Sequence, residues 1–119
     1  MRLIVDTEYR GHHSEYLDIL INSPGTKGCL FVLHPKYIEK KTAKFLENIT
    51  YYEFEPIDGY FGKIDEIRFL NKIIRNHKVK ECILLNFNHY FSILPFFKIK
   101  VINLSAIYYL PHFFDTSLS

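Results

Sequence analysis

A chain of 119 residues, 48% of them hydrophobic and 24% charged, has the composition of one globular domain with a real core rather than of a disordered segment. A formal net charge of +2 is too small to favour a nucleic-acid partner. No apolar run is long enough for a membrane-spanning helix, and Met1 leads into a strand-like run without the features of a secretory signal. With only two cysteines in the chain, we expect a cytoplasmic protein.

Short apolar runs alternate with longer periodic segments along the chain. The apolar runs predict strands at residues 2–6, 29–34, 50–55, 82–87 and 100–105. Apolar residues at helical spacing predict helices at residues 14–22, 35–48, 63–77 and 88–94. Ser14 is the expected N-cap of the first helix, and Pro35 opens the second. In the third helix, Glu66 is expected to lie off the apolar face.

Four of the five predicted strands are continuous apolar runs, which is typical of strands buried on both faces of a parallel sheet. Strand–helix alternation favours right-handed crossovers between parallel strands. We therefore expect an α/β protein with a three-layer α/β/α, Rossmann-like architecture. Its doubly wound parallel five-stranded sheet would have the order 3-2-1-4-5 in chain numbering. Residues 1–105 would form this domain, and residues 106–119 an apolar tail or the start of a second domain.

This strand order also predicts how far apart the two cysteines, Cys29 and Cys82, lie. Strand 1 separates the strands that carry them, so their Cα atoms would lie about 9–10 Å apart. That distance exceeds the reach of a disulfide, about 7 Å. The sequence therefore predicts two buried free thiols.

Ligands of doubly wound sheets bind at the carboxyl ends of the strands, where the strand order reverses. Here that point lies between strands 1 and 4. The loops after these strands supply the following polar residues: Arg10, Gly11, His12, His13, Ser14, Glu15, Asn86, Asn88 and His89. His34 and His112 are expected at the same edge. Polar residues also collect wherever strands end in loops, so a ligand-facing cluster and an ordinary solvated edge both remain open.

Several site chemistries are poor fits to this loop. Gly11 stands alone, without the other glycines of a dinucleotide-binding turn, and the chain has no nucleoside-triphosphate loop. His12 and His13 are adjacent and point apart on a turn, with no cysteine or carboxylate at a ligand spacing, so we expect no metal and no cofactor. The start of the first helix, with Arg10 beside it, remains able to hold one anionic group.

The segment "RLIVDTEYRGHHSEYLDIL" resembles the start of a GT-B glycosyltransferase, a strand followed by a glycine–histidine turn and a helix. "LLNFNHYF" resembles the fourth strand of that family, and "VINLSAIYYLPHFF" resembles the segment after the fifth. The resemblance implies a Rossmann-like, acceptor-side amino-terminal domain facing a second, donor-binding domain. Its substrates would be a nucleotide-sugar and an acceptor hydroxyl, and the chain would be inactive without the donor-binding domain.

The resemblance also implies roles for individual residues. Gly11 would let the turn pass near the donor phosphates, while His12 and Asn88 would line the cleft beside Arg10 and Ser14. A general base would come from this domain, and His13 or His89 suits the task because the pKa of imidazole lies near neutrality. The alternatives are that His13 packs on the first helix and His89 starts the fourth.

Two surfaces suggest partners. Lys36, Lys40, Lys41 and Lys44 could rest on an anionic membrane that carries a lipid-linked acceptor, or form a solvated helix face. The apolar tail "IYYLPHFF" would either meet a partner chain, a second copy or the donor-binding domain, or fold back over the sheet. The alternative function is a stand-alone Rossmann-like binding or interaction module without catalysis.

Overall fold

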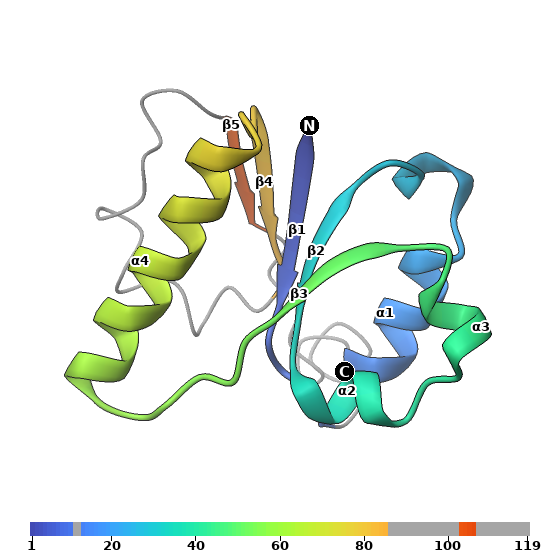
Figure 1. Cartoon of the computed structure of the whole chain (residues 1–119), viewed down its shortest axis with the longest axis horizontal. Coiled ribbons are helices and arrows are strands. Elements are labelled where there is room, and N and C mark those ends of the chain that lie inside the picture. The colour runs from blue at the N-terminus through green and yellow to red at the C-terminus, as the bar shows by residue number, and fades with distance from the viewer. Residues whose placement is uncertain (11–12, 86–102, 107–119) are drawn as a thin grey trace, which may run out of the picture.

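The computed structural model describes residues 1–10, 13–85 and 103–106 (Figure 1). The strands are β1 (Arg2–Asp6), β2 (Leu30–Leu33), β3 (Thr50–Glu53), β4 (Glu81–Leu84) and β5 (Asn103–Ala106). The helices are α1 (His13–Ile21), the 3₁₀ helix η1 (Pro24–Thr26), α2 (Pro35–Glu39), α3 (Ala43–Leu46) and α4 (Tyr60–Asn76). The α/β class predicted from the sequence is confirmed. The predicted helix at 88–94 and tail residues 107–119 lie outside the described residues.

The strands form one parallel sheet in the order β3-β2-β1-β4-β5. β1 lies between β2 and β4, with Leu3 in register with Leu30 on one side and Cys82 on the other. Since all strands run the same way, the loops that follow β1 and β2 leave from one edge of the sheet. We call this edge the carboxyl edge, and the opposite one the amino edge.

Helices cover both faces of the sheet (Figure 1). On one face, Leu3, Val5 and Cys82 pack in a core with Leu70 and Ile74 of α4. On the other face, the core contains these residues of the sheet, of α1 and of α2: Ile4, Phe31, Leu33, Leu17, Tyr37 and Ile38. Alternate residues of one strand therefore enter two separate cores, which is why residues 3–5 of β1 and Leu30–Leu33 of β2 are uninterrupted apolar runs.

The cysteines are free and buried, as predicted. Cys29 belongs to the core beneath α1 and α2, and Cys82 to the core beneath α4. The two thiols thus lie on opposite faces of the sheet. The sheet itself therefore separates them, in addition to the strand between them. Burial raises the pKa of Cys82 to about 12, so this thiol stays protonated and unreactive at neutral pH.

The prediction of one helix over residues 35–48 is wrong. α2 ends at Glu39, and α3 begins at Ala43. The hydroxyl of Thr42 accepts a hydrogen bond from the backbone N–H of Phe45 at 3.2 Å, which makes Thr42 the N-cap of a new helix. A threonine that caps in this way competes with continuation of the preceding helix. The chain therefore turns between the two helices.

Other helix boundaries also differ from the prediction. α1 begins at His13, so Ser14 lies inside the first turn and is not the N-cap. α4 begins at Tyr60, before the predicted start at residue 63. Glu66, which we expected off the apolar face of α4, is only 1% exposed. None of the helices in the described part of the chain is long and apolar enough to cross a membrane.

Candidate functional site

The structure describes only some of the predicted site residues. Arg10 is exposed at the end of the loop after β1, and Ser14 is half-buried in the first turn of α1. His13 starts α1, and its backbone alone is described. The remaining site residues lie outside the described residues: Gly11, His12, Asn86, Asn88, His89 and His112. A pocket shared by the loops after β1 and β4 therefore stays a prediction.

The loop after β1 is held by an aspartate at the end of the strand. Asp6 is 1% exposed, and its Oδ1 accepts a hydrogen bond from the backbone N–H of Glu8 at 2.9 Å. An aspartate that bonds to the backbone two residues later closes a local turn without help from the rest of the protein. Asp6 therefore fixes a local turn where β1 ends, at the carboxyl edge of the sheet.

Glu8 and Arg10 form a two-pronged ion pair in this loop. Oε1 of Glu8 accepts from Nε of Arg10 at 2.9 Å, and Oε2 accepts from Nη2 at 3.0 Å. Oε1 also accepts from the backbone N–H groups of Tyr9 and Arg10, each at 3.0 Å. The hydrogen bonds from Arg10 lower the pKa of Glu8 to about 2, against the opposing effect of partial burial. An anionic ligand of Arg10 would have to compete with Glu8.

The loop after β1 contacts the end of β2 through Tyr9 and His34. Their ring centroids lie 4.3 Å apart, and His34 is 6% exposed. Nδ1 of His34 accepts the backbone N–H of Lys36 at 2.9 Å, which caps the start of α2. Burial lowers the pKa of His34, so the ring is neutral at pH 7. With Nδ1 as the acceptor, the proton of the neutral ring is on Nε2.

Two cations lie over the Tyr9 ring. Nζ of Lys36 is 5.3 Å from the ring centroid, and Cζ of Arg10 is 5.9 Å from it. Lys36 also donates to the Tyr9 hydroxyl at 3.4 Å. These contacts bring a lysine from α2 and an arginine from the loop after β1 onto one aromatic side chain. The carboxyl edge therefore offers N–H donors beside an aromatic surface.

The sequence predicts Arg10 and His34 at this edge; in the structure Arg10 lies in the loop after β1, and His34 directly follows β2. The prediction missed Glu8, Tyr9 and Lys36. The acid–aromatic–base order "EYR" was the available signal, because such a run in a short loop can pair Glu8 with Arg10. The contact of Lys36 with Tyr9 joins residues 27 positions apart and had no local signal.

The described cluster brings several hydrogen-bonding and cationic groups together at the carboxyl edge. It combines a neutral imidazole, an ammonium group, a guanidinium group and a phenol, which together suit hydroxyl or anionic groups of a polar ligand. Among the residues described, no group of three or more His, Cys, Asp or Glu side chains could hold a metal ion. Two hollows lined by described residues, of about 410 and 220 Å³, lie at the amino edge and not at this site.

These features define the class of the protein as α/β, with a parallel sheet and a polar cluster at its carboxyl edge. Comparison with known proteins gives no match: no family model fits the chain, and no curated protein or solved structure is significantly similar to it.

Proposed function

We propose that the chain is a Rossmann-like, doubly wound domain that serves as the acceptor-side, amino-terminal half of a GT-B-like glycosyltransferase. The observation that carries the proposal is the position of β1. This strand runs parallel to β2 on one side and β4 on the other, and the order of connection reverses beside it. A ligand site is expected outside the carboxyl ends of strands at such a point.

The polar cluster supports an acceptor role at that edge. The rings of His34 and Tyr9 pack against each other. Arg10 and Lys36 place cationic groups over the Tyr9 ring. α1 starts at His13, so this histidine enters the helix at the same edge as the cluster. We assign the general base to His13 or His89, and we assign acceptor and donor contacts to Arg10, Gly11, His12, Ser14 and Asn88.

The proposed reaction transfers a sugar from a nucleotide-sugar to an acceptor hydroxyl, in the cytoplasm. The acceptor oxygen forms the new bond to the anomeric carbon, the nucleotide leaves with the bonding electron pair, and the histidine takes the hydroxyl proton. A donor-binding domain, on the same or another chain, would grip the nucleotide. Without that domain the two substrates are not held in reacting geometry, which can forfeit roughly 7–11 kcal/mol of barrier lowering.

The test compares the 119-residue chain with the same chain supplied with the product of the neighbouring coding sequence. Both are incubated with a panel of nucleotide-sugars and acceptors, and sugar transfer is followed by mass spectrometry. We expect transfer only in the second mixture, and its loss in His13→Gln or His89→Gln. His77→Gln is the matched control, because His77 caps the end of α4 at the amino edge.

Two outcomes would contradict this proposal. Transfer by the isolated chain would show that it is a complete enzyme. No transfer in either mixture, together with acceptor-independent capture of a protein partner, would support the alternative of an interaction module without catalysis.

A further inference from the structure

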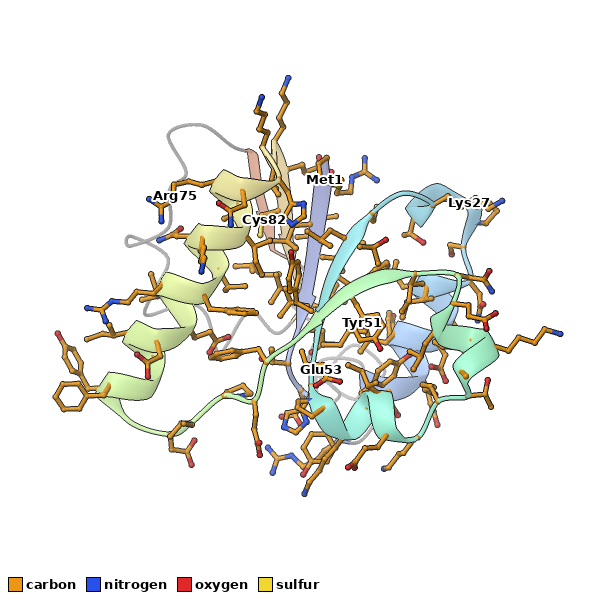
Figure 2. The ribbon with its side chains drawn as sticks, viewed as in Figure 1. Met1, Lys27, Tyr51, Glu53, Arg75 and Cys82 are labelled. Atoms are coloured by element: carbon orange, nitrogen blue, oxygen red, sulfur yellow. The ribbon has the colours of Figure 1, made fainter. Side chains whose placement is uncertain are left out.

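A hollow of about 410 Å³ lies at the amino edge, on the opposite side of the sheet from the proposed acceptor site. It is lined by three separate segments: the start of β1, the turn around η1 and the start of β4. The lining residues are Met1, Arg2, Gly25, Lys27, Gly28, Cys29, Lys80 and Glu81. Figure 2 shows Met1 and Lys27 at this edge of the molecule. Its volume falls within the usual range for small-molecule sites, about 300–1,000 Å³.

The lining is strongly basic. Arg2, Lys27 and Lys80 contribute three positive side-chain charges and Glu81 one negative charge, so the side chains of the lining carry a net +2. The whole chain carries the same formal net charge of +2. The formal side-chain charges of all the other residues sum to zero.

The only carboxylate of the lining is already engaged. Glu81 forms an ion pair with Nε of Arg2, its neighbour in the register of β1 and β4. Lys27 and Lys80 are exposed and come from segments on different sides of the hollow. An anion that enters would meet two lysines and the outer N–H groups of an arginine whose position is fixed by its partner.

The backbone leaves room for such an anion. A Cβ on Gly25 or Gly28 would have no heavy atom within 4 Å, so both glycines face open space. Gly28 also has a φ of +82°, a conformation that side-chain-bearing residues rarely adopt. This turn therefore presents bare backbone beside Lys27.

We propose that this amino-edge hollow binds a small phosphorylated polyanion, of which a diphosphate group is the simplest form. Lys27 and Lys80 contact the two ends of the anion, and the Arg2–Glu81 pair forms the wall between them. The site is independent of the proposed glycosyl transfer, because it lies at the other edge of the sheet and shares no residue with the acceptor cluster. Binding to such an exposed site weakens with salt.

The test is a titration of the isotope-labelled 119-residue chain with inorganic diphosphate at low ionic strength, followed by NMR. Inorganic phosphate and uridine diphosphate are run in parallel arms to separate the diphosphate requirement from a nucleoside contribution. We expect saturable shifts of the Gly25 and Gly28 amide signals. Lys27→Gln and Lys80→Gln should each weaken diphosphate binding by up to about fivefold. Lys40→Gln, at the opposite edge, is the control.

A second pair of variants keeps the proposal testable if a lysine substitution disturbs the fold. Gly25→Glu and Gly25→Gln introduce side chains of nearly the same shape, and the Cβ that both add would meet no heavy atom within 4 Å. Gly25→Glu should weaken binding more than Gly25→Gln, since only the former adds a negative charge. The proposal would be overturned if the two Gly25 variants bound diphosphate equally well. It would also be overturned if Lys40→Gln weakened binding as much as Lys27→Gln and Lys80→Gln, or if diphosphate shifted only the signals of residues 7–10 and 34–36.

Discussion

The hydroxyl of Tyr37 in α2 donates a hydrogen bond of 2.5 Å to Oδ1 of Asp18 in α1. Nζ of Lys41, in the turn between α2 and α3, reaches the same carboxylate at 2.7 Å. Burial, and then the Asp18 carboxylate, raise the pKa of Tyr37, so the phenol remains a donor. One carboxylate thereby ties α1 to the helices that follow β2.

Tyr37→Phe tests this tie. The substitution keeps the buried ring and removes only the donor, so we expect a loss of about 1–2 kcal/mol in the free energy of unfolding. Urea denaturation measures the loss. Tyr60→Phe is the matched control. Because Tyr60 is 75% exposed, this substitution should not measurably change the free energy of unfolding. Equal stabilities of the two variants would show that the Tyr37–Asp18 bond contributes nothing net.

Gly62→Ala should destabilise the chain despite the high helix propensity of alanine. A Cβ at Gly62, in the first turn of α4, would lie 1.9 Å from the carbonyl oxygen of Ile57. Backbone has to shift to relieve that overlap, and overpacking of this kind costs about 1–3 kcal/mol. Thermal melting measures the effect. Gly25→Ala, whose Cβ meets nothing within 4 Å, should be tolerated, and equal melting temperatures would contradict the account.

Glu8 should titrate at unusually low pH because of Arg10. Its pKa is lowered from 4.5 to about 2, so the ion pair stabilises the fold above pH 4.5 and is lost as the pH falls toward 2. In Arg10→Gln, NMR of the Glu8 carboxyl carbon should show the midpoint moving up toward its ordinary value. Arg75→Gln, on α4 in Figure 2, should leave the midpoint unchanged. A low midpoint that survives Arg10→Gln would assign the shift to another cause.

His34 should make stability fall in mildly acidic solution. Its pKa is lowered in the folded state, so the unfolded chain binds the proton more readily. The stability linked to His34 is complete above its ordinary pKa of 6.5 and decreases as the pH falls below that value. His34→Asn keeps a side-chain acceptor that suits an N-cap. The variant should lose this dependence of stability on pH, which urea denaturation at several pH values would measure. His77→Gln should retain the dependence of stability on pH, and its loss in that variant would contradict the assignment to His34.

The class of fold could be predicted because the inner strands are short apolar runs. Ile4 and Val5 are adjacent in β1, yet each is buried, one in the core beneath α1 and the other in the core beneath α4. Only a strand covered on both faces needs apolar residues without alternation. The same logic placed Cys29 and Cys82 in the interior.

The break between α2 and α3 could not be predicted from periodicity. Lys41 falls at helical spacing with apolar residues, but it is held there by Asp18, 23 positions earlier in the chain. Thr42 then starts a new helix through its own side chain. A local pattern carries no information about the distant carboxylate. The periodicity of residues 35–48 therefore predicts one continuous helix.

The candidate site was predictable only in part for the same reason. His34 followed directly from its position at the end of a strand. The contact between His34 and Tyr9 depends on the register of β1 and β2, which pairs Asp6 with Leu33. Spacing within either segment does not fix that register.

The enclosed position of β1 has a consequence for deuterium exchange. Leu3, Ile4 and Val5 are at most 1% exposed and bond to parallel strands on both sides. Their amide hydrogens can exchange with solvent deuterium only when the whole sheet opens, so their exchange rates report the global free energy of unfolding. Amides of β3, whose residues are largely exposed, would exchange through smaller local openings. A ligand bound at either edge of the folded sheet would slow exchange in β1 by mass action, and would thus be detectable in amides that the ligand does not touch.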